Sequence, residues 1–477
     1  MKIAALAATA LGLLAAAQAR ATVRLPHIFS DRMILQRDQP VTVWGWAEPS
    51  EPIIVRVAGQ NKPATAHADG KWSVTLDPLR VGPALTMTVN GATSTVTVTD
   101  VLVGDVFLCS GQSNMAMSLD AAKRHPGVAE DVAAADFPRL RFFKTPDLMS
   151  KTPEDDVAAA WVAVTPRSLA GFSAVAFYFG RALHRHLGVP IGLIRASHAG
   201  GPAEAKMPRA ALLTLDIGRR YDDEARKREA SWTPERIATY NAETLAKWEA
   251  AVKDAAARGA KPPARPAPRA SAIDFAYPAS DYNAQIAPVI RFTKRAVLWY
   301  QGEHNAARVR AFEYRRLFPR LIESWREASG QPDLPFLFVQ LPAFGAAGAG
   351  DDWPLVRESQ LLTLRTVPHT AMVTAIDTGE RDNVHPADKQ PIGERLALEA
   401  RRLLYGEAVT GCGPLYDHCT IDGPRIVVHF RHLGGGLRGR DGASLGGFMV
   451  SGADRKFFPA TVTIVGDHIV IQHPEIP

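Results

Sequence analysis

The sequence predicts a mixed α/β protein in which a domain built on a parallel sheet lies between two β-rich segments. Residues 22–100 and 406–477 contain short runs of alternating apolar and polar residues separated by turn residues, as in antiparallel strands. Between them, residues 101–405 alternate short apolar runs with stretches of helical periodicity, the pattern of strands joined by crossover helices. The length of 477 residues also favours two or three domains over one.

The composition is that of a globular protein with an ordinary core. Apolar residues make up 46% and charged residues 22% of the chain, which excludes intrinsic disorder. The three cysteines, Cys109, Cys412 and Cys419, are too few for a disulfide scaffold or a four-thiolate zinc site. Burial of apolar surface therefore has to stabilise the fold.

The first 21 residues have the features of a secretory signal sequence. A positive start at Met1-Lys2 precedes an apolar run, and the small residues Ala17, Ala19 and Ala21 form an A-x-A type cleavage pattern. The run is shorter than the roughly 20 residues that span a bilayer. We therefore predict cleavage and export of the mature chain to the periplasm or the outside of the cell, with no membrane span.

Residues 22–100 are predicted to form a small antiparallel sandwich-like domain. Turn residues such as Asp69-Gly70 and Asn90-Gly91 separate its alternating runs. The predicted strands are Val41–Trp46, Ile53–Val57, Trp72–Leu76, Leu85–Val89 and Thr93–Val98.

Residues 101–405 are predicted to form the domain with the parallel sheet. Its predicted strands are Leu102–Leu108, Gly192–Ala196, Ala296–Tyr300, Phe336–Gln340 and Ala371–Asp377. Its predicted helices are Ser173–Leu187, Phe312–Ser329, Leu355–Thr366 and Gly393–Tyr405, the last closed by Gly406.

An insertion at about residues 209–270 carries most of the net charge of +6. It holds 13 basic and 9 acidic residues between Arg209 and Arg269. Thr233-Pro234 reads as an N-cap with a first-turn proline, and the charges after it fall between apolar residues at helical spacing. A Pro-rich connection, 261–269, follows. This pattern favours a solvated surface insertion over a nucleic-acid site, with a patch for an anionic partner as the alternative.

Residues 406–477 are predicted to be a C-terminal β segment with strands at Arg425–Phe430, Ala460–Val465 and His468–Gln472. The short loop between Cys412 and Cys419 would allow a disulfide in an exported protein, and the spacing leaves that pairing open.

Four predicted strands of the central domain run into polar, Gly-containing loops. These segments are 107–115, 193–201, 297–305 and 373–386. In open α/β sheets, ligands bind beyond the carboxyl ends of the strands. One sheet would therefore bring these four loops together, although nearly 300 residues separate the first from the last.

The first loop offers a nucleophile. Ser113 follows Gly111 at a predicted strand-to-helix turn, where a neighbouring base could activate its hydroxyl. Met115 stands where the G-x-S-x-G elbow of α/β-hydrolases has its second glycine, so the loop is not that motif. Ser110 is the weaker candidate, and a helix cap is the alternative role for Ser113.

The last loop offers the base. Asp382 lies three residues before His385, close enough in sequence for its carboxylate to orient the imidazole. Asp377 and Asp388 are the alternative carboxylates. The two middle loops offer oxyanion donors, because Gly200 can present an unhindered N–H and Gln301 a side-chain amide beside the Ser113 N–H.

Several of these segments resemble the SGNH-type serine esterases, specifically the group of sialate O-acetylesterases and xylan acetylesterases. The resemblance rests on Gly-Gln-Ser-Asn-Met at 111–115, on Trp-Tyr-Gln-Gly-Glu at 299–303 with Asn305, and on Asp382-x-x-His385-Pro386 with Lys389. It also includes 282–288, 334–341 and 353–360, and so spans most of residues 101–405.

The resemblance implies a flavodoxin-like, three-layer SGNH-type fold for this domain. It implies a triad of Ser113, His385 and Asp382, and an oxyanion hole of Ser113, Gly200 and Gln301, with neither metal nor cofactor. Residues near these positions would bind substrate: Gln112, Asn114, His198, Glu303 and Asn305.

The second motif departs from the family pattern. Ser197-His-Ala-Gly-Gly201 stands where relatives usually have Ser-Trp-Gly-Gly-Thr, and Lys206 stands where they often have tryptophan. These changes should alter the acyl or sugar pocket.

The predicted function is therefore that of a secreted serine esterase that removes O-acetyl groups from carbohydrates. The substrate would be acetylated xylan or its oligosaccharides, or O-acetylated sialic acid. The alternatives are an esterase for short-chain esters of non-sugars and a non-catalytic glycan-binding protein. A metal-dependent deacetylase is disfavoured, because no His/Asp cluster has ligand-like spacing. The oligomeric state is not predicted.

Overall fold

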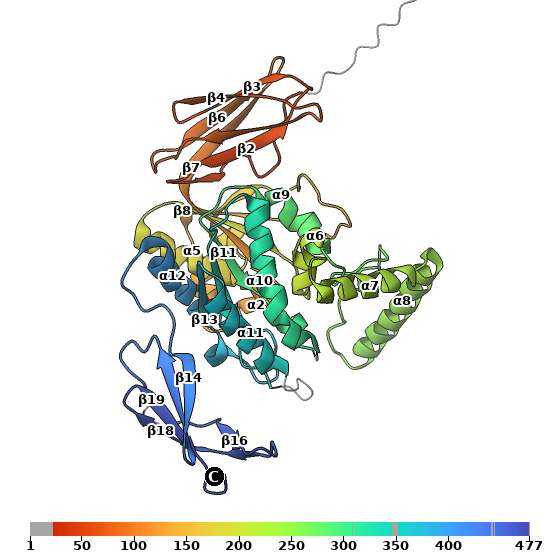
Figure 1. Ribbon diagram of the computed structural model, residues 1–477. Helices are drawn as coiled ribbons and strands as arrows, with labels where there is room; N and C mark the ends of the chain where they lie inside the picture. Colours follow the sequence, from red (N-terminus) through yellow and green to blue (C-terminus); the bar gives the residue numbers. More distant parts are fainter. Residues whose placement is uncertain (1–21, 308, 346–351, 440–441, 443, 477) are drawn as a thin grey trace, which may run out of the picture.

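The computed structural model describes residues 22–307, 309–345, 352–439, 442 and 444–476. The predicted signal sequence, residues 1–21, lies outside the described residues. Figure 1 shows three parts in a row, with the N-terminal strands at the top, the α/β body in the middle and the C-terminal strands at the bottom. None of the helices in these described ranges is long and apolar enough to cross a membrane.

The body is organised around a mostly parallel sheet with the strand order β13-β12-β11-β7-β10-β8-β9. All neighbouring pairs along this path are parallel except β8 with the edge strand β9. The strands are β7 (Thr95–Gly111), β8 (Phe137–Lys144), β9 (Trp161–Val164), β10 (Ile191–Ser197), β11 (Ala296–Tyr300), β12 (Phe336–Gln340) and β13 (Thr370–Thr374). The predicted mixed α/β class is confirmed.

The strand order contains the flavodoxin order that the resemblance implied. In that order the first parallel strand lies between the second and the third, and the fourth and fifth follow on the side of the third. The run β10-β7-β11-β12-β13 has this arrangement, with β7 as its first strand. The difference is the added pair of β8 and β9, which extends the sheet beyond β10.

Strand β7 connects the N-terminal segment to the body without a break. The two predicted strands at 93–98 and 102–108 are parts of this one strand, which crosses residue 100. Its first residues alternate in exposure and pair antiparallel with β6 (Leu85–Asn90), whereas Val101–Gly111 is wholly buried. The burial changes because the first part of β7 belongs to an antiparallel ladder with one exposed face. The second part lies inside a parallel sheet that is covered on both faces.

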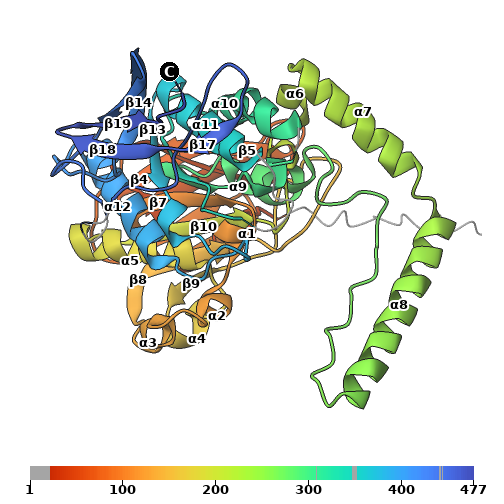
Figure 2. The ribbon, with the colours of Figure 1, turned by 90° about the horizontal axis from the view of Figure 1, so that it is seen from below.

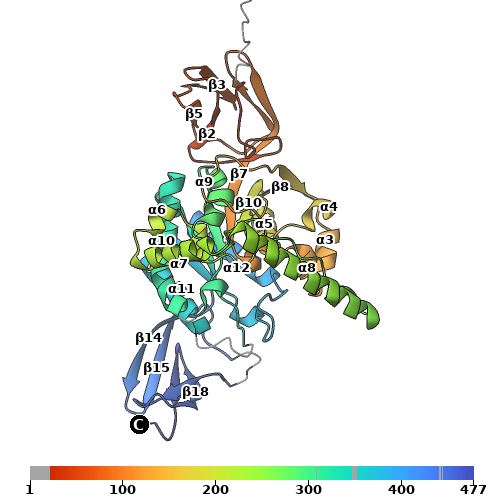
Figure 3. The same ribbon diagram turned by 90° about the vertical axis from the view of Figure 1, so that its right-hand side faces the viewer.

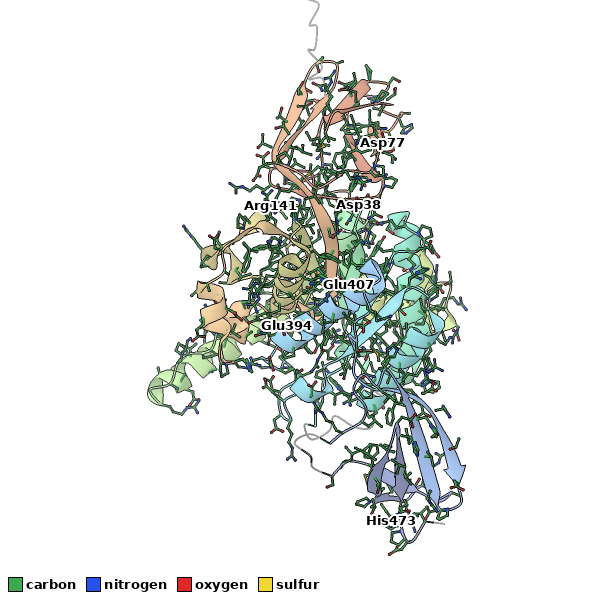
Figure 4. The ribbon with its side chains drawn as sticks, turned by 90° about the vertical axis from the view of Figure 1, so that its left-hand side faces the viewer. Asp38, Asp77, Arg141, Glu394, Glu407 and His473 are labelled. Carbon is green, nitrogen blue, oxygen red and sulfur yellow. The ribbon has the colours of Figure 1, made fainter. Side chains whose placement is uncertain are left out.

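The remaining N-terminal strands form antiparallel ladders, and β1 (Ile34–Gln36) runs parallel to β7. They are β2 (Val41–Trp46), β3 (Pro52–Val57), β4 (Gln60–Thr65) and β5 (Lys71–Leu76). Strand β4 was not predicted, because it is polar and contains Pro63. Arg141 ties the segment to the body by donating to the Arg32 and Asp100 carbonyls and to the Asp100 carboxylate (Figure 4).

Two pairs of helices cover the sheet. Helix α5 (Ala174–Leu187) packs against α12 (Gln390–Tyr405), and α10 (Val309–Ser329) packs against α11 (Asp352–Thr366). Figures 1 and 2 show the two pairs on opposite sides of the sheet. Shorter helices join these elements: α1 (Ser113–Ala116), α2 (Leu119–Ala122), α3 (Val128–Ala133), α4 (Pro166–Leu169), α6 (Arg209–Leu212) and α9 (Ala287–Ile290).

The four predicted helices are present, with adjusted ends. Ser173 caps α5 through its side chain, and Gly188 ends it in the left-handed conformation. Helices α10, α11 and α12 each begin three residues earlier than predicted. Strand β13 ends at Thr374, earlier than the predicted Asp377, and a short 3-10 turn follows it at Ile376–Thr378.

The insertion projects from the body as a helical arm (Figures 2 and 3). It consists of α7 (Asp216–Ala230), α8 (Pro234–Ala257) and an extended return. Thr233 caps α8 by accepting from the Arg236 N–H, which confirms the predicted helix start. Only Ala255 of α8 is buried, as expected of a solvated helix.

The C-terminal segment has a small core of its own around Val450, Ile469 and Ile471. Its main sheet has the order β14-β15-β19-β18, beside the hairpin β16-β17. The bounds are β14 (Leu415–Asp422), β15 (Arg425–Arg431), β16 (Met449–Ser451), β17 (Phe457–Pro459), β18 (Thr461–Val465) and β19 (His468–Gln472). Cys412 and Cys419 are free thiols, so the bridge that their spacing would allow is not formed.

Candidate active site

Ser113 lies immediately beyond the carboxyl end of β7, at the first position of α1. Gly111 makes this sharp turn feasible. Its φ is +140°, and a Cβ there would lie 2.0 Å from the Tyr300 carbonyl oxygen of β11. Because the first N–H groups of a helix have no partner within it, α1 leaves the Ser113 N–H able to donate to a ligand.

His385 contacts the Ser113 side chain directly. The distance from His385 Nε2 to Ser113 Oγ is 2.7 Å, although 272 residues separate the two along the chain. Strand β13, from which the His385 loop departs, is the third strand over from β7. At the usual strand spacing that is about 14 Å, so the loop after β13 has to run back across the ends of β12 and β11.

Asn114 holds the returning loop in place. Its amide nitrogen donates to the Val384 carbonyl oxygen at 2.9 Å and to Glu303 Oε1 at 2.5 Å. Its amide oxygen accepts from Lys389 Nζ at 2.6 Å. Asn114 and Lys389 are buried, so these charge-assisted contacts join the loops after β7, β11 and β13 where water does not compete.

The surroundings of His385 keep its imidazole neutral. Burial, together with the positive charges of Lys389 and Arg124, lowers the pKa of His385 below its usual 6.5. Burial also lowers the pKa of Lys389 to about 7. A neutral imidazole 2.7 Å from a serine hydroxyl can accept its proton.

Asp382 lies on the same loop but does not contact the imidazole. Its side chain is exposed, and among the described residues no hydrogen bond joins it to His385. Asn383 shapes the loop instead, accepting from the His385 N–H and donating to the His385 carbonyl oxygen. The alternative carboxylates are engaged elsewhere, Asp377 with Arg395 and Asp388 near His125.

Gly200 and Gln301 lie at the ends of the two strands that flank β7. Gly200 follows β10 and has a left-handed φ of +78°. Gln301 follows β11 and is fully buried, with Oε1 accepting from the Tyr314 hydroxyl at 3.0 Å and Nε2 donating to Asn305 Oδ1 at 2.6 Å. An amide nitrogen carries two hydrogens, so one donor remains on Gln301 for a ligand.

All five residues predicted to bind substrate form hydrogen bonds within the protein. Gln112 Oε1 accepts from the His304 N–H, and Asn305 donates to Glu204. Asn114 and Glu303 bond to each other, and burial raises the pKa of Glu303. These side chains thus connect the loops around Ser113.

His198, the fifth of these residues, has a buried carboxylate partner. Its Nδ1 lies 3.2 Å from Asp281 Oδ1, and the other oxygen of Asp281 lies 2.5 Å from Lys206 Nζ. Burial alone would raise the pKa of Asp281, but Lys206 and His198 hold it below its usual value. A Cβ on Gly201 would lie 2.4 Å from Asp281, so a threonine there would not fit.

The two departures from the family pattern, His198 and Lys206, are therefore linked through Asp281. Sequence reasoning did not find Asp281, because it lies 75 residues beyond Lys206 and outside the four loops. The only signal was its position directly before the segment 282–288, which resembles the family.

Comparison with known proteins identifies the family. Residues 270–402 match the family model described as carbohydrate esterase, sialic acid-specific acetylesterase. The chain is 31% identical over 429 residues to the sialate O-acetylesterase of Mus musculus, with 82% of this chain and 75% of that protein covered. It is 30% identical to the Homo sapiens sialate O-acetylesterase over 82% of this chain and 73% of that one.

Among solved structures, a carbohydrate acetylesterase from Xanthomonas citri is similar over 95% of this chain and 92% of its own, with a TM-score of 0.79 and 33% identity. The chain therefore belongs to the sialate O-acetylesterase family of carbohydrate esterases.

Proposed function

We propose that this protein is an exported serine esterase that removes O-acetyl groups from carbohydrates, with Ser113 as nucleophile and His385 as base. The contact of 2.7 Å between Ser113 Oγ and His385 Nε2 carries the proposal, because it pairs a nucleophile with a base in a carbohydrate esterase. Export is supported by the signal-like residues 1–21.

The reaction would proceed in two steps. His385 Nε2 accepts the proton of Ser113 Oγ as that oxygen bonds to the acetyl carbon, and the same proton passes to the leaving sugar oxygen. The acetyl group is then bound to Ser113 as an ester. Water, activated by His385, attacks this ester, and the breakdown releases acetate and restores the serine hydroxyl.

Three donors would stabilise the negative oxygen that forms in each step. The Ser113 N–H lies at the start of α1, the Gly200 N–H lies in the turn after β10, and Gln301 has a second amide hydrogen besides the one bonded to Asn305. Each donor follows a different strand of the central trio β10, β7 and β11, as expected of the SGNH-type arrangement. The hydrogen bond that Gln301 donates to Asn305 and the one that it accepts from Tyr314 fix the Gln301 side chain.

Asp382 is the proposed acid of the triad, on the basis of its position three residues before His385. Its carboxylate has to turn from solvent toward Nδ1 of His385 during the reaction. In the absence of substrate, catalytic hydrogen bonds are often long or unformed, and a flexible exposed side chain can close such a gap.

Acetate release measures the proposed function. The enzyme should release acetate from acetylated xylooligosaccharides or from 9-O-acetyl sialic acid, assayed side by side. Ser113→Ala should lower kcat by at least ~10³-fold on the active substrate and on 4-nitrophenyl acetate. Ser231→Ala, on the exposed insertion, is the matched control.

Two results would contradict the proposal. The first is near-normal turnover by the Ser113→Ala variant. The second is faster hydrolysis of butyrate and longer esters than of any sugar acetate, which would indicate an esterase for other acyl groups.

A further inference from the structure

Phe275 is an exposed aromatic side chain beside the proposed oxyanion hole. It is 39% exposed, in a protein whose large apolar side chains are mostly buried. It follows the Pro-rich return of the insertion and belongs to none of the four loops that the sequence analysis singled out.

The residues on both sides of Phe275 are firmly anchored. Ile273 and Tyr277 are buried against Ala225 of α7. Asp274 forms an ion pair with Arg228 of the same helix at 3.3 Å. Because a buried contact and an ion pair hold the segment to the arm on both sides of Phe275, its neighbours fix the position of the exposed Phe275 ring.

The ring lies against two of the active-site loops. A Cβ on Gly200 would be 3.2 Å from Phe275 Cε2, so the ring covers the Gly200 turn. Its centroid is 6.3 Å from that of His198 and 5.7 Å from that of His304, both with edge-on geometry. The His304 N–H donates to Gln112, the residue before Ser113. Phe275 therefore lies at the rim of the site, on the side of β10 and β11.

The cations around this aromatic rim are paired with carboxylates. Lys206 pairs with Asp281, Arg310 with Glu204 and Arg228 with Asp274. These are the three cations, together with burial, that lower the pKa of His304. Each of these three cations therefore already has a carboxylate partner within the described residues. None of the three is left unpaired to bind the carboxylate of a sugar acid.

We propose that Phe275 is the platform on which the pyranose ring of a neutral acetylated sugar packs. The inference rests on the proposed esterase function and names its substrate class. The C–H groups on one face of a pyranose carry slight positive charge and suit the negative face of an aromatic ring. An apolar wall with few polar groups is also the usual form of a small-molecule site.

His198 supplies the polar contact beside this platform. Its Nδ1 faces the ionised Asp281 and therefore carries the hydrogen. The other ring nitrogen, Nε2, is left for a ligand, and the side chain is 20% exposed. A ring nitrogen next to an aromatic platform can bind a sugar hydroxyl.

The test compares a sugar ester with an ester that has no ring. In Phe275→Ala, kcat/KM for acetylated xylooligosaccharides should fall at least ~10-fold, mainly through KM, whereas the loss on methyl acetate should be several-fold smaller. Phe275→Tyr should retain most of the sugar activity, because it keeps the ring face. Phe457→Ala, on an exposed Phe of β17, is the matched control and should match the wild type.

Three outcomes would overturn the inference: equal losses on both esters, no loss on the sugar, or a wild-type preference for 9-O-acetyl sialic acid over neutral sugar acetates. Each can occur while Ser113→Ala is inactive, which keeps the proposed function standing. Activity that survives in Ser113→Ala would instead contradict the proposed function itself.

Discussion

The loops after β10 and β13 each carry a histidine near Ser113, and the two histidines are in opposite situations. His385 reaches the serine at 2.7 Å, but the described residues place no carboxylate on its ring. His198 has a buried carboxylate, Asp281, on Nδ1, yet in the described structure it forms no hydrogen bond to the serine. Each loop thus has one half of the Ser-His-Asp pattern.

Both contacts join residues far apart in the sequence, but they form for different reasons. The His385–Ser113 contact forms because Asn114 bonds to the Val384 carbonyl and to Lys389. These two bonds hold the loop after β13 over the ends of β12 and β11. The His198–Asp281 contact forms because Lys206 requires a buried counter-charge. In the proposed mechanism the first contact serves the reaction, whereas the second fixes His198 beside the buried Lys206–Asp281 pair.

The largest expected effect comes from His385. His385→Gln should lower kcat by at least ~10³-fold on 4-nitrophenyl acetate, because Ser113 loses its base. His198→Gln, the equivalent change in the other loop, should cost far less. Comparable losses in the two variants would show that His198 also takes part in proton transfer. Steady-state kinetics of both variants measures the difference.

The second effect is on stability. Asp281→Asn leaves the Lys206 ammonium buried without a counter-charge and should destabilise the fold by about 3 kcal/mol in urea unfolding. Asp155→Asn, which breaks the exposed pair with Lys71, should cost below about 1 kcal/mol. If both substitutions cost the same, the Lys206–Asp281 pair is not a buried ion pair of structural importance. Adding Lys206→Met to Asp281→Asn should restore much of the stability.

A smaller effect is expected from Asp382. A charge-assisted hydrogen bond from the His385 imidazolium to this carboxylate is worth about 2 kcal/mol, so Asp382→Asn should lower kcat about 30-fold. The exposed neighbour Arg381 provides a control in Arg381→Gln. A loss of less than threefold on the sugar ester would remove Asp382 from the proposed triad.

The smallest effect is a shift in pH dependence. Lys389 helps to lower the pKa of His385, and kcat/KM falls as His385 becomes protonated. In the wild type the acid limb of the profile should therefore lie below pH 6.5, the usual value for histidine. Lys389→Met removes this charge, raises the pKa of His385 and should move the limb to higher pH. An unmoved or downward-shifted limb would contradict the role of Lys389.

Much of the fold could be predicted from local patterns. Strands β11, β12 and β19 have the predicted bounds, because short apolar or alternating runs between turn residues define them without help from neighbours. Helix starts were less accurate. Helix α12 was predicted to begin at Gly393, where its apolar run begins. It begins at Gln390 instead, with Pro391 in its first turn.

The main errors arise where tertiary pairing overrides local pattern. Two predicted strands merge in β7, since both ends find partners in one continuous sheet. The polar strand β4 exists because β3 pairs with it. In both cases the pairing with neighbouring strands decided the outcome, and a local sequence pattern does not reveal that pairing.

The sequence by itself determined the chemical groups of the site, because Ser113, Gly200, Gln301 and His385 each follow a recognisable strand in a polar loop. It also indicated the family, through the motif residues at 111–115, 299–303 and 382–386. Only the tertiary structure decided which groups meet. Contacts such as Ser113–His385, His198–Asp281 and Phe275–Gly200 join residues that are 75 or more positions apart. Their formation depends on the packing of whole elements, the sheet order and the anchoring of loops by buried side chains, and not on neighbours along the chain.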